Sequence, residues 1–143
     1  YVYQIEHFEF VPGIFDLCQH AQNLGYKIII ITNQSGIDLG YYTVQDFETV
    51  SNYMLTEFEK RQVHIDELYW CQFMQSIDHK PYPGLFIKAK YKYDLDMKSS
   101  FSIGDKGLLR DFEAYSTKSS ITFFLDGEAN TLFSFSKSIS NCL

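Results

Sequence analysis

Three short runs of polar residues in this chain are suited to holding a phosphate group or a hard metal ion. Residues 32–36 read Thr-Asn-Gln-Ser-Gly, residues 80–84 read Lys-Pro-Tyr-Pro-Gly and residues 104–106 read Gly-Asp-Lys. The first and the last directly follow short apolar segments. Together the three runs predict an aspartate-based phosphatase, although the carboxylate that would attack phosphorus is not among the 143 residues.

The run at residues 32–36 can bind phosphate oxygens without a full charge. Its hydroxyl and amide side chains and its backbone N–H groups form a polar nest, and Gly36 allows a tight bend. The alternative is an ordinary polar turn after a buried strand. Because the other two runs occur in the same chain, we favour phosphate binding.

Lys80 is the candidate cation of the site. A lysine just ahead of the turn at residues 81–84 can offset negative charge on a phosphate and on an attacking carboxylate. The alternative is a solvated surface lysine, the commonest state of this residue type. The adjacent His79 is either a second phosphate contact or a loop histidine.

Asp105 is the candidate metal ligand. A carboxylate at the end of a strand suits Mg²⁺, which keeps several waters and needs only one or two acidic residues. Asp105 could equally cap the next helix, and Asp111 is either a further contact or a surface acid. Zinc is not expected, since Cys71, Asp78 and His79 do not make the four-ligand set of a structural zinc site.

The composition is that of one globular domain with an acidic surface. A chain of 143 residues with 45% hydrophobic and 21% charged residues can bury a substantial core. The net charge of −6 argues against nucleic acid or an anionic membrane as the main partner. Three widely spaced cysteines, without a secretory signal or a membrane span, favour reduced thiols in the cytoplasm.

Strands alternate with helices along the chain, which predicts an α/β domain with a mostly parallel sheet. The β-branched run at residues 27–32 is typical of a strand buried on both faces. Further strands are expected at residues 67–71, 100–103 and 120–125. The Ser-rich tail at residues 131–143 could add a strand and a frayed end. Helices are expected at residues 12–24, from the N-cap Thr43 to about Lys60, at 83–93 and at 108–115.

These elements place the polar runs at one edge of the sheet. In an open α/β sheet, ligands bind at the carboxyl ends of the strands, close to the point where the strand order reverses. Thr32 and Asn33 follow one strand, and Gly104 and Asp105 follow another. The runs are therefore expected to lie close together.

The motifs resemble those of the haloacid dehalogenase superfamily, in particular its branch of heptose bisphosphate and histidinol-phosphate phosphatases. The matching stretches are residues 1–3, 8–13, 32–37, 40–42, 80–84 and 103–106. The resemblance extends from residue 1 to about residue 115, and the Thr-Asn-Gln-Ser-Gly run is fairly specific to this branch.

The resemblance implies a Rossmann-like three-layer fold and a Mg²⁺-dependent phosphatase that passes through an aspartyl-phosphate. The implied substrate is a small phosphorylated sugar such as a heptose bisphosphate. The implied site residues are Thr32, Asn33 and Lys80 for catalysis, Gln34, Ser35 and His79 for substrate contact, and Asp105 for the metal.

The chain departs from the family pattern at four places. The Asp-x-Asp-Gly-Thr segment that carries the nucleophile lies upstream of the part matched by Tyr1 and is absent. The cysteine and histidine zinc loop is short and keeps only Cys71, and His79 stands where an arginine is common. Leu109 stands where an acidic residue is usual, with Asp111 displaced along the chain.

The absent segment would also supply the central strand of the sheet, between the strands that end at Thr32 and at Ile103. Without it, two buried edges would keep unpaired N–H and C=O groups, each of them costly. We therefore expect residues 1–143 to be a single, N-terminally truncated domain whose first strand is missing. If the chain is complete, another segment, such as the tail from Thr131, must fill the gap.

The favoured interpretation is a cytoplasmic Mg²⁺-dependent phosphatase of a small sugar phosphate, with no nucleic acid or membrane partner. The first alternative is a relative that kept the fold, lost the chemistry and binds phosphate or a partner. The second is a different α/β module with a coincidental Gly-Asp-Lys run, which the order and spacing of three motifs disfavour. An Asp-x-Asp segment shortly upstream of Tyr1 would separate the first two interpretations.

Overall fold

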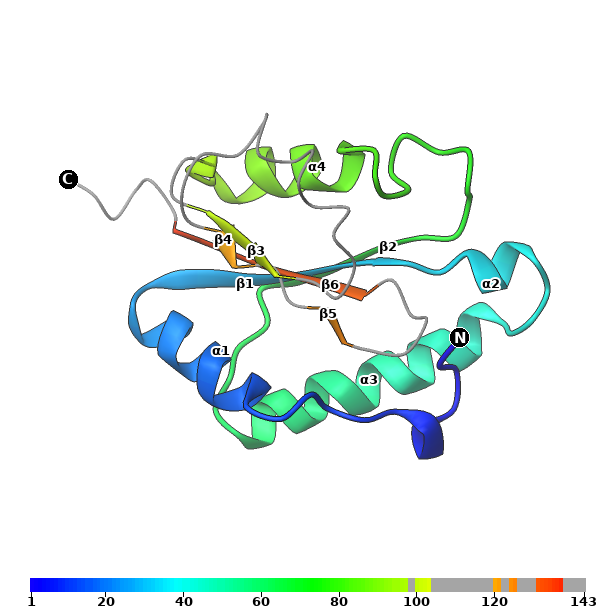
Figure 1. Cartoon of the computed structure of the whole chain (residues 1–143), viewed down its shortest axis with the longest axis horizontal. Coiled ribbons are helices and arrows are strands. Elements are labelled where there is room, and N and C mark those ends of the chain that lie inside the picture. Colours follow the sequence, from blue (N-terminus) through cyan, green and yellow to red (C-terminus); the bar gives the residue numbers. More distant parts are fainter. Residues whose placement is uncertain (98–99, 104–119, 122–123, 126–130, 138–143) are drawn as a thin grey trace.

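The computed structural model describes residues 1–97, 100–103, 120–121, 124–125 and 131–137. A single sheet separates two layers of helices, with α1 and α3 on one face and α4 on the other (Figure 1). This arrangement confirms the predicted three-layer α/β fold. No helix in the described part of the chain is long and apolar enough to cross a lipid bilayer.

In the described part of the chain, three longer helices follow the apolar periodicity of the sequence. They are α1 (Ile14–Asn23), α3 (Val44–Lys60) and α4 (Gly84–Tyr93), at bounds close to those predicted. Two short elements, η1 (Ile5–His7) and α2 (Ser35–Asp38), were not predicted, because a single turn is too short to show a helical period. The helix predicted at residues 108–115 lies outside the described residues.

Thr43 begins α3 as the sequence predicts. Its hydroxyl accepts the Asp46 N–H at 3.1 Å, and its own N–H donates to the Asp46 carboxylate at 2.8 Å. The Thr43 N–H and the Thr43 hydroxyl both donate to the Asp46 carboxylate, and these two hydrogen bonds lower the pKa of Asp46. The reciprocal pair satisfies two backbone donors that the first turn of a helix leaves unpaired.

The main path of the sheet has the order β2-β1-β6-β3, with β4 (Ser120–Ile121) and β5 (Phe124–Leu125) also paired to β6. β1 (Tyr26–Asn33) and β2 (Glu67–Cys71) are parallel. β6 (Thr131–Lys137) is antiparallel to β1 and to β3 (Phe101–Ile103). The predicted common direction therefore holds for β1, β2 and β3, and β6 runs the opposite way.

β6 occupies the place for which the sequence predicts a missing strand. It lies between β1 and β3, with Thr131 opposite Thr32 and Lys137 opposite Tyr26. A strand in this position pairs the backbone groups of two edges that would otherwise be buried and unpaired. Within residues 1–143 the tail therefore supplies a strand at this position, antiparallel to its neighbours. The expectation of a further strand upstream of Tyr1 stays a prediction.

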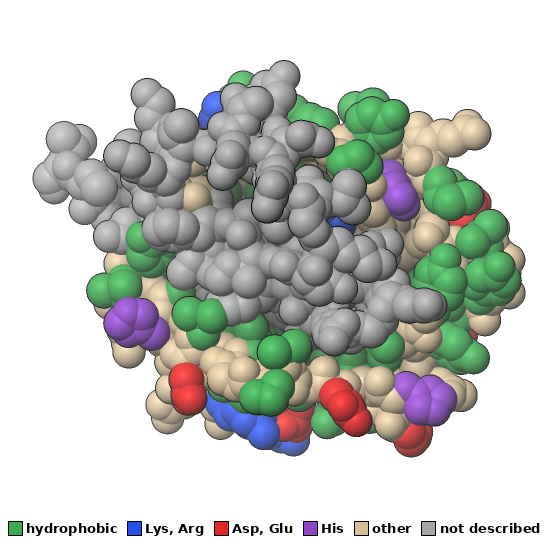
Figure 2. Space-filling view, viewed as in Figure 1, with side chains coloured by type: hydrophobic (Ala, Val, Ile, Leu, Met, Phe, Trp, Pro, Cys, Tyr) green, Lys and Arg blue, Asp and Glu red, His purple; other side chains and the backbone are tan. Residues whose placement is uncertain are grey.

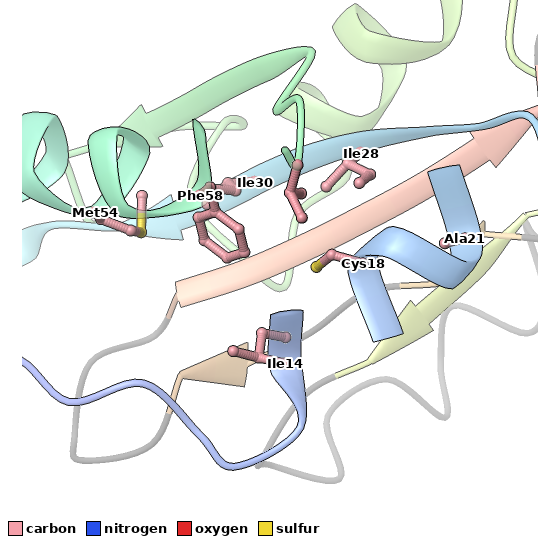
Figure 3. Close-up of a cluster of buried hydrophobic side chains, with 8 residues drawn as sticks. Ile14, Cys18, Ala21, Ile28, Ile30, Met54 and Phe58 are labelled. Atoms are coloured by element: carbon pink, nitrogen blue, oxygen red, sulfur yellow. The ribbon is translucent and has the colours of Figure 1, made fainter. Parts of the chain in front are cut away.

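The isoleucines of β1 build the core on both faces of the sheet. Ile28 and Ile30 pack with α1 and α3 around the buried Phe58, as Figure 3 shows. Ile29 and Ile31 pack on the other face, against α4. All four isoleucines are fully buried, which confirms the strand predicted to be covered on both sides.

Replacement of Phe58 by alanine should destabilise the domain strongly. The ring has 0% exposure and packs edge-on against other rings of the cluster, so its loss leaves a cavity. We expect the free energy of unfolding to fall by about 3–5 kcal/mol in urea titrations. Phe73→Ala is the matched control, because Phe73 is 56% exposed. Equal effects of the two substitutions would contradict the assignment of Phe58 to the core.

Candidate functional site

The polar run at residues 32–36 begins where the parallel strands end. Thr32 and Asn33 are the last residues of β1 and pair with the end of β2. Ile103, the last residue of β3, and Ile30 of β1 both pair with Phe133 of β6. β1, β2 and β3 therefore end at one edge of the sheet, as the sequence predicts.

Asn33 joins this edge to the loop that precedes α4. Its Oδ1 accepts the Lys80 N–H at 2.9 Å, and its Nδ2 donates to the Lys80 carbonyl at 3.0 Å. The side-chain amide thus pairs with the Lys80 backbone as a neighbouring strand would. Because the N–H can only donate and the carbonyl can only accept, the orientation of the Asn33 amide is fixed.

That orientation defines the role of the His79 ring. Asn33 Nδ2 lies 3.3 Å from His79 Nδ1 and is a donor, so Nδ1 must accept. A neutral ring then carries its proton on Nε2. This Nε2 atom is buried and has no hydrogen-bond partner among the described residues. His79 can therefore donate to an acceptor on a ligand.

The Lys80 ammonium group lies at the end of β1. Its Nζ donates to the Ile31 carbonyl at 3.1 Å, and the residue is half-buried. The peptide bond between Lys80 and Pro81 is cis. The positive charge is thus next to Thr32, the following residue of β1.

Thr32, Gln34 and Tyr42 form a second buried network. Gln34 Nε2 donates to Thr32 Oγ1 at 2.8 Å, and the Tyr42 hydroxyl donates to Gln34 Oε1 at 2.6 Å. The Thr32 hydroxyl donates to the Asn33 carbonyl over a long 3.4 Å. Burial, together with the nearby Tyr1 phenol, raises the pKa of Tyr42 to about 12. Tyr42 thus remains a neutral phenol at ordinary pH.

Two glycines are required by close packing around the site. A Cβ on Gly36 would overlap the Tyr42 ring and lie 3.0 Å from the Tyr1 ring. A Cβ on Gly84 would collide with the Ile77 carbonyl and with the Asp78 carboxylate. The glycines that end the first two polar runs therefore allow the loops to approach their neighbours.

All the predicted site residues that fall in the described part of the chain lie at this edge. Ser35, the first residue of α2, is buried beside the network. Asp105 lies outside the described residues, as do Lys106 and Asp111, so its role as a metal ligand stays a prediction. Within the described ranges, no group of three or more His, Cys, Asp and Glu side chains could hold a metal ion.

Sequence reasoning assigned no role to Tyr42. It lies in one of the stretches that match the family, but a tyrosine after a glycine carries no signal that its hydroxyl reaches a glutamine eight positions earlier. An Asp-x-Asp pair also occurs at Asp94 and Asp96. These residues follow α4 and precede β3, which places them at the opposite edge of the sheet from Thr32.

The surface around the site is largely apolar. In Figure 2, hydrophobic side chains gather at the right-hand edge, where Figure 1 has α2 and the connection from β2 to α4. The exposed apolar side chains of these segments are Leu39, Tyr41, Phe73, Met74, Ile77 and Tyr82.

Comparison with protein families identifies the chain. The family described as polynucleotide kinase 3 phosphatase matches residues 4–123. The chain belongs to this family. The resemblance to haloacid dehalogenase-type phosphatases seen in the motifs is thereby confirmed.

Two proteins similar in sequence to this chain are heptose bisphosphate phosphatases. The D-glycero-alpha-D-manno-heptose-1,7-bisphosphate 7-phosphatase of Campylobacter jejuni is 47% identical over 80% of this chain and 66% of its own length. The beta-heptose counterpart of Helicobacter pylori is 43% identical over 74% of this chain and 64% of its own length. The chain therefore spans slightly less than two thirds of the length of these relatives.

Two solved structures share the fold. A putative HAD-like phosphatase from Mesorhizobium loti superposes with a TM-score of 0.70 at 24% identity, over 74% of this chain and 56% of its own. The D,D-heptose 1,7-bisphosphate phosphatase of B. bronchiseptica, complexed with magnesium and phosphate, gives a TM-score of 0.63 at 19% identity. That match covers 68% of this chain and 56% of the other.

Replacement of Asn33 by alanine should release the Lys80 backbone. The substitution removes the partners of one N–H and one carbonyl, and an unpaired buried polar group costs about 1–3 kcal/mol. We expect the Lys80 amide to exchange faster with solvent, as measured by NMR. Asn52→Ala on the exposed face of α3 is the matched control. An unchanged exchange rate at Lys80 would show that the amide pairing does not hold the loop.

Tyr42→Phe should remove a phenol that loses its proton only above the ordinary pKa of tyrosine. Tyrosinate absorbance, taken as wild type minus variant, should rise near pH 12 and not near the ordinary value of 10.0. Burial favours the neutral phenol in the folded state. The contribution of Tyr42 to stability is therefore complete below pH 10.0 and is lost as the pH rises toward 12. A difference signal that rises near pH 10.0 would mean that Tyr42 is solvated.

Proposed function

We propose that this chain forms the phosphate-binding part of a cytoplasmic, Mg²⁺-dependent phosphatase that acts on a small phosphorylated sugar such as a heptose bisphosphate. One observation carries the proposal. The Thr32 hydroxyl, the Lys80 ammonium at the Ile31 carbonyl, and the His79 ring beside Asn33 all lie near the end of β1, and His79 Nε2 has no hydrogen-bond partner among the described residues. The names of the curated relatives support the choice of substrate.

Thr32 is proposed to donate its hydroxyl hydrogen to a phosphoryl oxygen. Its hydroxyl is within 3.4 Å of the Asn33 carbonyl, and a charged phosphoryl oxygen is a stronger acceptor than a neutral carbonyl. Thr32 is 1% exposed, so little water competes for its hydroxyl.

Lys80 is proposed to offset the negative charge of the phosphoryl group in the transition state. Its ammonium group is held at the end of β1 by the Ile31 carbonyl. The oxygen and the nitrogen of the Asn33 side-chain amide both bond to the Lys80 backbone. Asn33 is therefore proposed to act on the phosphoryl group indirectly, by holding Lys80. Preorganised charge of this kind commonly contributes more to the rate than any other single effect.

The reaction needs a carboxylate from a segment outside these 143 residues. Its oxygen would attack phosphorus, the bond from phosphorus to the sugar oxygen would break, and that oxygen would take up a proton. Water would then attack the phosphorus of the aspartyl-phosphate, which releases inorganic phosphate and restores the carboxylate. His79, through its Nε2 proton, is proposed to hold a substrate oxygen.

Asp105 is proposed to hold Mg²⁺, which when bound supplies positive charge against the phosphoryl oxygens. The placement of β3 fits this role, because β3 ends at the same edge as β1 and Asp105 follows it closely in the sequence. Carboxylate, hydroxyl and phosphate oxygens are the hard ligands that Mg²⁺ prefers. The crystal of the B. bronchiseptica phosphatase with magnesium and phosphate is consistent with this choice of ion.

The proposal is tested by phosphate release from heptose bisphosphate, with the chain joined to whatever its reading frame encodes upstream. Thr32→Val should lower kcat by about 10²–10³, because one donor to the transition state is lost, whereas Thr32→Ser should keep most of the activity. Lys80→Gln should have a comparable effect. EDTA should abolish phosphate release until Mg²⁺ is added in excess, and Asp105→Asn should not be restored by the Mg²⁺ concentration that restores the wild type.

Matched controls separate charge from damage to the fold. Lys90→Gln removes an ammonium group from the exposed side of α4 and should leave kcat unchanged. An oligonucleotide with a 3′-phosphate tests the substrate suggested by the family's description, and the net charge of −6 predicts that it is a poor one. Equal rates for Thr32→Val and wild type, or a preference for the oligonucleotide, would overturn the proposal.

A further inference from the structure

We propose that Tyr42 is a positioning residue that directs the Thr32 hydroxyl toward the phosphoryl group through the side-chain amide of Gln34. The inference rests on the proposed function, because it concerns the group that would receive the hydroxyl hydrogen. It adds a role within the protein to the predicted substrate contact of Gln34, since one N–H of its amide donates to Thr32 and its Oε1 accepts from Tyr42.

The direction of the hydrogen bonds carries the argument. The Tyr42 hydroxyl lies 2.6 Å from Gln34 Oε1, a distance typical of an O–H donor and short for an N–H donor. The oxygen of the amide therefore faces Tyr42, and the nitrogen faces Thr32. Gln34 Nε2 then donates to a lone pair of Thr32 Oγ1 at 2.8 Å.

This arrangement leaves the single hydroxyl hydrogen of Thr32 pointing away from Gln34. A hydroxyl has one hydrogen to donate and two lone pairs to accept with. With Gln34 donating to a lone pair, the hydrogen is directed to an acceptor other than Gln34. Gln34 rotated by half a turn would accept that hydrogen and withdraw it from a phosphate.

Burial makes the arrangement persistent. Thr32, Gln34 and Tyr42 are 1%, 7% and 6% exposed, so water does not replace their hydrogen bonds. Hydrogen bonds in series strengthen one another at low dielectric. Because burial raises the pKa of Tyr42 to about 12, the phenol keeps its proton and remains a donor at neutral pH.

The Tyr42 ring is held in place by the N-terminal residues and by Gly36. Tyr3 stacks on it with ring centroids 5.4 Å apart and planes at 4°, and Tyr1 lies at 5.9 Å. A side chain at Gly36 would overlap the ring. The ring therefore rests against the polar loop, and its hydroxyl reaches Gln34 without an intervening water.

Removal of the phenol hydroxyl should free the Gln34 amide to rotate. In Tyr42→Phe, Oε1 has lost its donor and can accept the Thr32 hydrogen instead. We expect kcat to fall by at least tenfold, up to the 10²–10³ loss expected for Thr32→Val. Tyr41→Phe is the matched control, since Tyr41 is 61% exposed and adjacent in sequence.

A double-mutant cycle distinguishes positioning from packing. If Tyr42 acts through the Thr32 hydroxyl, Tyr42→Phe should lower kcat in the wild type and have no further effect in Thr32→Val. An equal loss in both backgrounds would show that the substitution acts through packing and would overturn the inference. No loss in the wild-type background would overturn it as well.

NMR of the Gln34 side-chain NH₂ group tests the relay without any activity. Tyr42→Phe and Thr32→Val should each shift these resonances and speed their exchange with solvent, whereas Tyr41→Phe should not. Unchanged resonances in Tyr42→Phe would overturn the relay. If the wild type releases no phosphate from any substrate, the proposed function fails, and the NMR result alone decides whether Tyr42 orients Gln34.

Discussion

The complete enclosure of β1 is the constraint on which the rest of the structure depends. Its four isoleucines are buried, two against α1 and α3 and two against α4. Its backbone pairs on one edge with β2 and on the other with β6. A strand with no exposed side must have every polar group paired internally, and this requirement extends into the polar run at its carboxyl end.

In the polar run, side chains form the hydrogen bonds that a neighbouring strand would otherwise provide. Asn33 pairs with the Lys80 backbone, and Gln34 links Thr32 to Tyr42. Satisfied networks of this kind are rigid, because any rearrangement would leave a buried donor or acceptor unpaired. The same bonds that make burial tolerable thus hold the candidate catalytic groups in fixed directions, which is what electrostatic catalysis requires.

Much of this arrangement could be predicted from the sequence. The β-branched run predicted β1 because burial on both faces leaves a continuous apolar pattern, and Thr43 predicted the start of α3 because its capping is local. The direction of β6 could not be predicted, since a pattern with a period of two is the same in both directions. The link from Tyr42 to Gln34 was missed because it depends on ring packing around Gly36.

The central place of β6 has a consequence for how the domain assembles. Thr32 pairs with Thr131, so this contact closes a loop made of most of the chain, whereas the contacts of β1 with α1 close only short ones. Contacts between distant residues bear the larger entropy of loop closure and form slowly. Among the described strands, β6 is the one that covers this edge of β1, and without a strand there the edge would present unpaired backbone groups beside a run of isoleucines. An edge left unpaired in this way can mispair with another chain.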